Sequence, residues 1–258
     1  MTLAFSTLGC AGAPLDTVLD LAQANQITGL ELRAADEEFT HIGLTPAERR
    51  TLRSRIEDAG LEILAVDSYV HLCGVEEQPL AEHLELAHDL GARGVRVFMR
   101  DDPEATGEPT AGELRAMDRV AQSSTEVSVL LETHDTHSSG RSIAAFCALL
   151  DREVPSHNAR VIWDAAHTRR TGETAAESLE LLRPWLEFVQ IKDHDSHDSY
   201  KPVAMGAGDY PIAELLKALD GTGYPLSLEW ELKWHPDLPP LSEALPATLA
   251  WLGDSKSN

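Results

Sequence analysis

The sequence predicts a (β/α)8 barrel, a closed ring of eight parallel strands with helices packed outside it, in a single domain. Two observations predict it. Short apolar segments typical of strands alternate with stretches of helical periodicity along nearly the whole chain of 258 residues, and no linker or shift of composition divides them. Alternating strands and helices favour a parallel sheet covered by helices, and eight such units in about 250 residues match this barrel.

The expected strands are short runs of apolar residues that are rich in β-branched side chains. They cover residues 3–7, 29–33, 62–67, 94–98, 127–132, 160–164, 188–193 and 226–230. Each run is shorter than a usual helix and is followed by a segment with helical spacing. Eight strands therefore follow one another along the chain, each with a helix behind it.

The helices are predicted from their apolar spacing and from their end signals. Thr45 caps the second helix, Glu48 stands at its capping-box position, and Gly60 ends it. Thr110 and Glu113 repeat the capping box before the fourth helix. Further helical faces are expected at residues 15–22, 143–150, 212–219 and 242–252.

A doubly wound sheet is the other arrangement that alternating strands and helices can adopt. It would call for a glycine-rich first turn that binds a dinucleotide. The first turn contains Gly9 and Gly12 but lacks the full dinucleotide fingerprint. We therefore assign the barrel to residues 1–252 and expect residues 253–258 to form a flexible tail.

Charge and composition exclude several classes of partner. The chain has 43 acidic and 21 basic residues, a formal charge of −22, and no run of Lys and Arg. Because phosphates would be repelled, we expect no nucleic-acid and no membrane partner. The first residues do not predict a signal peptide, and we expect no membrane span, because no apolar segment reaches the roughly 18 residues that it needs. The three cysteines are far apart in the sequence, which is typical of reduced thiols, so we predict a cytoplasmic protein. A homo-oligomer is compatible with the sequence.

Residues with oxygen ligands stand at or near the ends of the last four strands, which meet on one rim of a barrel. Buried carboxylates repel one another unless a cation is bound. Oxygen ligands favour Mn²⁺ or Mg²⁺, and they also accept Co²⁺ or Zn²⁺. Glu231 is the alternative to the ligand at position 229. We therefore predict one divalent metal ion held by Glu132, Asp164, Gln190 and Glu229.

The stretch from Asp193 to Asp198, "DHDSHD", also contains residues that bind metals. No strand is expected to fix their geometry. We therefore expect a solvated loop or a lid here rather than a second metal site.

Five motifs resemble those of a known family in order and spacing: "LLETHD", "VIWDAAH", "FVQIKD", "GAGDYP" and "LSLEWE". The chain is similar to the sugar phosphate isomerase/epimerase family, whose members have a xylose isomerase-like TIM barrel. The resemblance extends from the second strand to the eighth. It is specific for the superfamily and not for a substrate.

The resemblance implies roles for individual residues. The family's metal ligands are Glu, Asp, His and Glu, and the residue that departs from them here is Gln190. Glu132 and Glu229 are implied to be ligands and catalytic proton carriers, one on each face of the substrate. The substrate-binding residues that it implies are His167, His134, Lys192, Glu31 and Arg33.

The resemblance further implies a divalent-metal-dependent isomerase or epimerase of a small carbohydrate or polyol derivative. A proton would leave next to a metal-polarised carbonyl and give an enediolate. The alternative is a lyase, a dehydratase of a cyclic keto-polyol or 3-dehydroshikimate-like substrate, because such dehydratases of this family also have Gln in the place of Gln190. A non-catalytic sugar-binding barrel is a further hypothesis, and the charge argues against the DNA endonucleases of the superfamily.

Overall fold

The computed structural model describes residues 2–123 and 126–255 of the chain. The barrel strands are β1 Leu3–Ser6, β2 Gly29–Arg33, β3 Glu62–His71, β4 Gly94–Phe98, β5 Ser128–Glu132, β6 Ala159–Asp164, β7 Leu186–Ile191 and β10 Leu226–Leu228. They close in the order β1-β10-β7-β6-β5-β4-β3-β2, and all neighbouring pairs are parallel. The predicted (β/α)8 barrel is confirmed.

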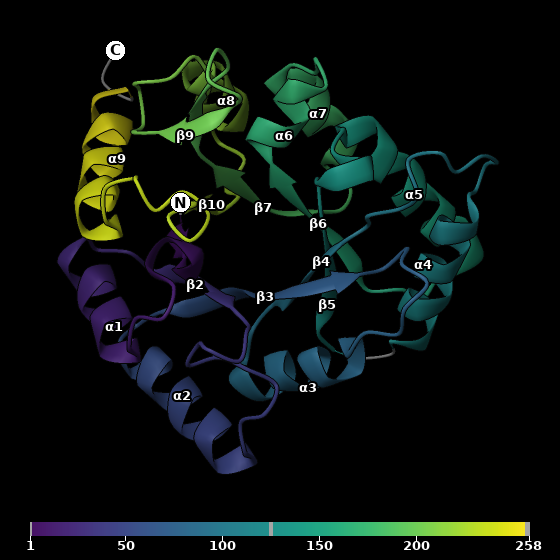
Figure 1. Cartoon of the computed structure of the whole chain (residues 1–258), viewed down its shortest axis with the longest axis horizontal. Coiled ribbons are helices and arrows are strands. Elements are labelled where there is room, and N and C mark those ends of the chain that lie inside the picture. The colour runs from purple at the N-terminus through teal and green to yellow at the C-terminus, as the bar shows by residue number, and fades with distance from the viewer. Residues whose placement is uncertain (1, 124–125, 256–258) are drawn as a thin grey trace.

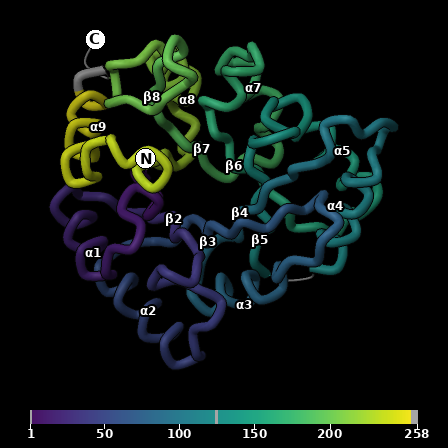
Figure 2. The backbone as a smooth tube through the Cα atoms, in the orientation of Figure 1, coloured from purple at the N-terminus to yellow at the C-terminus, as the bar shows by residue number. Residues whose placement is uncertain are grey.

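The helices form a ring outside the strands (Figure 1). They are α1 Leu15–Ala24, α2 Pro46–Asp58, α3 Leu80–Leu90, α4 Ala111–Gln122, α5 Gly140–Glu153, α6 Ala165–Arg170, α7 Ala175–Leu182, α8 Ile212–Leu219 and α9 Leu241–Ser255, with short 3-10 helices η1 Thr7–Cys10 and η2 Asp135–His137. The backbone tube passes once around this ring, so that the purple first helix lies beside the yellow last one (Figure 2).

The predicted capping boxes are present at the starts of two helices. The Thr45 side chain accepts a hydrogen bond from the backbone N–H of Glu48, and Thr110 does the same for Glu113. A third box, which begins with Thr174, starts α7. Each box satisfies N–H groups that the first turn of a helix leaves without a partner.

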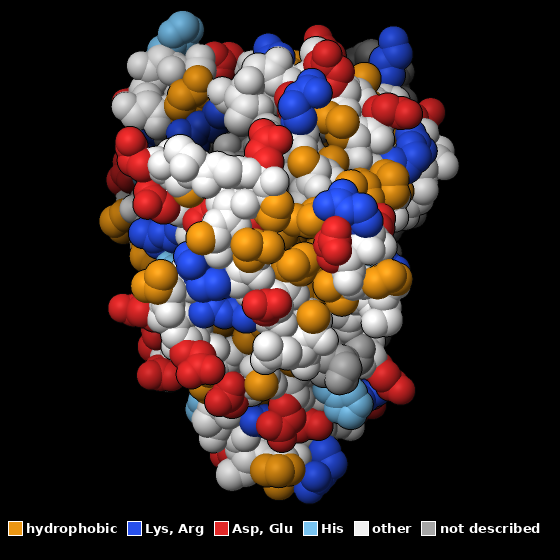
Figure 3. Space-filling view, turned by 90° about the vertical axis from the view of Figure 1, so that its right-hand side faces the viewer, with side chains coloured by type: hydrophobic (Ala, Val, Ile, Leu, Met, Phe, Trp, Pro, Cys, Tyr) orange, Lys and Arg blue, Asp and Glu red, His pale blue; other side chains and the backbone are white. Residues whose placement is uncertain are grey.

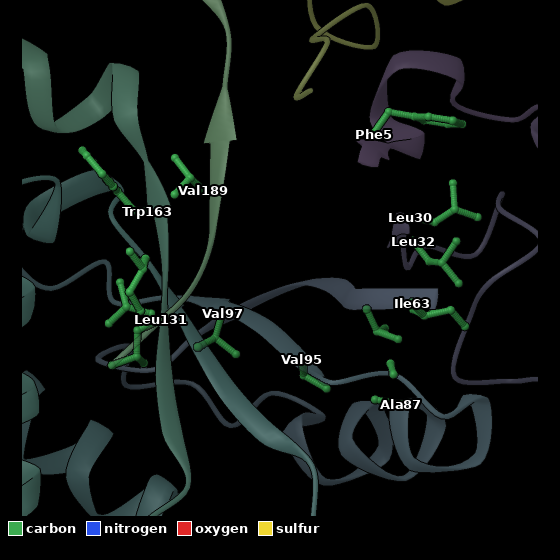
Figure 4. Close-up of a cluster of buried hydrophobic side chains, with 14 of the residues drawn as sticks. Phe5, Leu30, Leu32, Ile63, Ala87, Val95, Val97, Leu131, Trp163 and Val189 are labelled. Carbon is green, nitrogen blue, oxygen red and sulfur yellow. The ribbon is translucent and has the colours of Figure 1, made fainter. Parts of the chain in front are cut away.

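The apolar core has two layers, because successive residues of a strand point to opposite faces. Leu130 faces the inside of the barrel, where it packs in a small cluster with Phe188. Val129 and Leu131 face outward and belong to the larger core between strands and helices. Figure 4 shows this outer layer, with Leu131, Val97 and Trp163 on neighbouring strands.

Several segments differ from the prediction. The expected loop is wrong for the first half of the stretch, because β8 Asp193–Asp195 pairs antiparallel with β9 Lys201–Val203, whereas residues 196–198 form a turn. Asp193 fixes this hairpin by accepting hydrogen bonds from the backbone N–H groups of Gly206, Gly208 and Tyr210. β3 continues past the expected end to His71. Residues 253–255 of the predicted tail belong to α9, and residues 256–258 lie outside the described part of the chain.

The surface is mixed in character. On the face shown in Figure 3, hydrophobic side chains gather across the middle, between charged side chains of both signs. Within residues 2–123 and 126–255, every helix is too short or too polar to span a lipid bilayer. The three cysteines, Cys10, Cys73 and Cys147, are free.

Candidate active site

A cavity of about 610 Å³ opens at the carboxyl-terminal ends of the strands. This is the end of the barrel where such proteins place their active sites. Charged side chains line its inner part, among them Arg96, Glu132, Lys192 and Glu229. A volume of this size can enclose a small organic molecule.

The four predicted metal ligands are all buried, and two of them, Glu132 and Glu229, line this cavity. Glu132 ends β5, and Asp164 ends β6 in register with Gln190 of β7. Glu229 follows β10, where its backbone N–H donates to the carbonyl of Ile191. Glu132 is in register with Ile162, two residues before Asp164, and Gln190 is in register with Ser227, two residues before Glu229, so all four ligands stand at the carboxyl-terminal ends of neighbouring strands.

Lys192 lies between the carboxylates of the last strands. Its Nζ is 2.7 Å from Asp164 Oδ2, 2.6 Å from Glu229 Oε2 and 2.6 Å from Glu231 Oε1. Burial acts to lower the pKa of Lys192, but the three carboxylates outweigh it and raise that pKa well above its ordinary value. One ammonium group thus draws Asp164, Glu229 and Glu231 around a common point.

Arg96 is the second buried cation of the site. Its Nε lies 3.4 Å from Glu132 Oε2, and its NH1 lies 3.8 Å from Glu229 Oε1 and 4.0 Å from Asp67 Oδ2. Its guanidinium also stacks 4.6 Å from the centre of the Phe98 ring. The sequence analysis missed Arg96, although a basic residue inside the apolar run "GVRVF" is a signal of a buried charge.

The acidic groups of the site outnumber the two cations that pair with them. Burial raises the pKa of Asp67 to about 6, and Glu229 adds to the rise against the effect of Arg96. Burial also raises the pKa of Glu132 well above its ordinary value, and Glu229 again adds to the rise. Arg96 and Lys192 are thus too few to pair with every carboxyl group of the site, and the raised pKa values reflect this shortage of buried cations.

Three of the predicted ligands have a buried oxygen atom that faces the site, namely Glu132 Oε2, Asp164 Oδ2 and Gln190 Oε1, and only the last has neither a hydrogen bond nor an ion pair among the described residues. The first two lie within ion-pair distance of Arg96 and Lys192. Buried acceptors normally have a partner, and a hard cation would satisfy all three oxygens. The donor set therefore fits a divalent metal ion.

The side chains of the site would have to rearrange to bind a metal ion. No three His, Cys, Asp or Glu side chains of the described residues are arranged as a ready metal site. One predicted ligand is a Gln, and the ammonium of Lys192 lies between Asp164 and Glu229. Metal binding there would require this ammonium to move.

His134 and His167, which the resemblance implies to be substrate contacts, both line the cavity. Their rings lie 4.5 Å apart. Burial lowers the pKa of His167 well below its ordinary value, and nearby Lys192 lowers it further. His167 is therefore neutral at pH 7 and can both donate and accept a hydrogen bond.

Glu31 and Arg33 of β2 are buried, and neither is among the described residues that line the cavity. Glu31 accepts hydrogen bonds from Ser227 and from Gln190. Arg33 forms an ion pair with buried Glu38. The structure thus places Glu31 beside a predicted metal ligand and Arg33 in a separate ion pair.

Solved structures with the same fold cover nearly the whole chain. A probable 3-DHS dehydratase, AsbF, involved in petrobactin synthesis in Bacillus anthracis, has a TM-score of 0.78 at 19% identity over 98% of this chain and 99% of that chain. An L-ribulose 3-epimerase has a TM-score of 0.76 at 18% identity, over 99% and 94%. The IolI protein with a bound zinc atom has a TM-score of 0.75 at 17% identity, over 99% and 98%.

These identities establish a shared fold, and one fold can host different reactions. None of the curated proteins compared with the chain matches it. The family model described as a xylose isomerase-like TIM barrel matches residues 19–254. The match confirms the resemblance found in the sequence motifs: the chain belongs to the xylose isomerase-like TIM barrel family.

Proposed function

We propose that the protein is a divalent-metal-dependent isomerase or epimerase of a small carbohydrate or polyol derivative. The observation that carries the proposal is the buried group of oxygen ligands beside the 610 Å³ cavity, in which Gln190 Oε1 has no hydrogen-bond partner among the described residues and two carboxylates are paired with Arg96 and Lys192. An L-ribulose 3-epimerase and a zinc-bound protein among the similar folds support it.

The metal ligands that we propose are Glu132, Asp164, Gln190 and Glu229. A bound divalent ion would polarise the substrate carbonyl and stabilise the negative charge that develops on its oxygen. Oxygen donors suit Mn²⁺ or Mg²⁺ and also accept Co²⁺ or Zn²⁺. Lys192 would leave its place between two ligands and keep its third partner, Glu231, on the cavity wall.

Glu132 and Glu229 are the proposed proton carriers. Both line the cavity, and both lie within 4 Å of the Arg96 guanidinium, which holds them in place. One carboxylate removes the proton next to the carbonyl, and the other returns a proton on the opposite face.

The proposal is tested by incubating the protein with Mn²⁺ in D₂O and a panel of ketoses, inososes and dehydroshikimate. For an isomerase or epimerase we expect deuterium from the solvent at one carbon of a product, detected by NMR. Loss of water from the substrate would instead identify a dehydratase. If the protein binds Mn²⁺ but catalyses neither exchange nor loss of water, the barrel is a binding protein and the proposal is wrong.

The second candidate, a dehydratase of a 3-dehydroshikimate-like acid, is favoured by Arg170. This residue lines the outer part of the cavity, and its guanidinium lies 4.5 Å from the centre of the Tyr200 ring. Within the described part of the chain, no carboxylate lies within ion-pair distance of Arg170. A carboxylate on the substrate would be a suitable partner for this unpaired cation.

For an acidic substrate, the change Arg170→Gln should raise KM about tenfold and leave kcat unchanged, because a charged hydrogen bond contributes about 1.5 kcal/mol. The KM of a neutral ketose should not change. Arg169→Gln is the matched control, since Arg169 is exposed and is not among the described residues of the cavity wall. Equal losses for acidic and neutral substrates would show that Arg170 does not recognise an anion.

A further inference from the structure

We propose that Glu31 is a positioning residue that turns the amide oxygen of Gln190 toward the metal site. The inference rests on the metal site of the proposed function. It assigns to Glu31 an action through a ligand, in place of the direct substrate contact that the sequence motifs imply.

Glu31 reaches Gln190 from a distant part of the sequence. It stands on β2, and Gln190 stands on β7, 159 residues further along the chain. Gln190 Nε2 donates to Glu31 Oε2 over 2.8 Å, and the hydroxyl of Ser227 on β10 donates to Glu31 Oε1. All three side chains are fully buried. The Glu31 carboxylate is therefore held on one side by Ser227 and binds the amide on the other.

The two ends of the Gln190 amide are chemically different, so the contact with Glu31 determines which atom is left for a metal. The NH₂ group is a donor, and only the oxygen can bind a cation. Because a carboxylate accepts the NH₂ group, the oxygen takes the other place, where it is buried without a hydrogen-bond partner. With the amide turned over, two acceptor oxygens would face each other, and NH₂ would point toward the metal.

The position of Glu31 also explains why it does not meet a substrate. Both of its carboxylate oxygens are engaged by Gln190 and Ser227, and it is not among the described residues that line the cavity. Partners behind a metal ligand typically change metal affinity by 10–100-fold when they are removed. Glu31 is suited to that role.

The test is a double-mutant cycle on Mn²⁺ affinity, measured by titration calorimetry on the purified full chain without substrate. We expect Glu31→Gln to weaken Mn²⁺ binding about 10–100-fold, because the new amide can bind either end of Gln190. In a Gln190→Ala background the same change should alter the affinity less than about threefold, since no amide remains to be oriented.

Asp67→Asn is the matched control for charge. It removes another buried negative charge of the site, and its recorded partners are Ser6 and Arg96, not Gln190. We expect it to weaken Mn²⁺ binding much less than Glu31→Gln does. The positioning role would be overturned if Asp67→Asn and Glu31→Gln weakened Mn²⁺ binding equally. It would also be overturned if Glu31→Gln weakened the binding as much in the Gln190→Ala background as in the unmodified protein.

Ser227→Ala provides a milder variant if Glu31→Gln does not fold. It leaves the carboxylate in place but removes one of its two hydrogen bonds. The inference is supported if Ser227→Ala weakens Mn²⁺ binding in the otherwise unmodified protein but has no effect on it in the Gln190→Ala background. An unchanged affinity in the otherwise unmodified protein contradicts the inference. If the unmodified protein binds no Mn²⁺, the proposed function fails, whereas normal binding by Glu31→Gln overturns the role of Glu31 alone.

Discussion

Replacing either Glu132 or Glu229 by Gln should lower the rate of proton exchange with solvent by about 10²–10⁴-fold, the usual contribution of a positioned proton carrier. The amide keeps an oxygen that can bind metal but cannot take up a proton. Both carboxylates line the cavity and lie next to Arg96, so each can reach a bound substrate. Deuterium incorporation at saturating Mn²⁺ and substrate measures the effect.

Glu180→Gln is the matched control, because Glu180 lies exposed on α7, away from the described residues of the cavity wall. It should exchange protons at the rate of the unmodified protein. If Glu132→Gln and Glu229→Gln keep that rate as well, neither residue carries a proton. A loss in only one of them would favour a reaction on a single face of the substrate.

Arg96→Met should lower the free energy of unfolding of the metal-free protein by about 3–5 kcal/mol, the usual cost of removing one partner of a buried ion pair. The change leaves Asp67, Glu132 and Glu229 near one another with one fewer buried cation between them. Urea unfolding with and without Mn²⁺ measures it. Added Mn²⁺ should restore part of the loss, because an ion that binds only the folded state stabilises it.

Arg93→Met is the matched control, since Arg93 immediately precedes the strand that holds Arg96. Arg93 pairs with Glu62 and Glu187, but all three side chains are partly exposed. Pairs of this kind contribute up to about 1 kcal/mol, so this variant should be nearly as stable as the unmodified protein. An equal loss in the two variants would show that the buried position of Arg96 has no special importance.

The barrel could be predicted because its signals are local. The alternation of strands and helices, and capping boxes such as Thr45 with Glu48, depend on neighbouring residues only. The rule that parallel strands end on one rim predicted that the proposed ligands stand at the same end of the barrel. The hairpin after β7 could not be predicted in this way, because Asp193 is fixed by backbone groups 13 to 17 residues away.

Contacts across the barrel were also hidden from the sequence. Glu31 and Gln190 stand on β2 and β7, far apart in the sequence, and only the closed ring brings their side chains within 2.8 Å. Lys192 was expected to bind substrate, but nothing in "FVQIKD" indicates that its ammonium lies between two predicted metal ligands. The alternation of residues along a strand indicates to which face of the sheet a side chain points, but it does not indicate which residue of a distant strand that side chain contacts.

Anomalous diffraction from crystals of the protein saturated with Mn²⁺ tests the metal site most directly. We predict one Mn²⁺ peak per chain within about 2.0–2.6 Å of an oxygen of each proposed ligand: Glu132, Asp164, Gln190 and Glu229. We also predict that the ammonium of Lys192 has moved from its place between Asp164 and Glu229. A map with no Mn²⁺ at these oxygens and with Lys192 still between the two carboxylates would contradict the metal site and the function that depends on it.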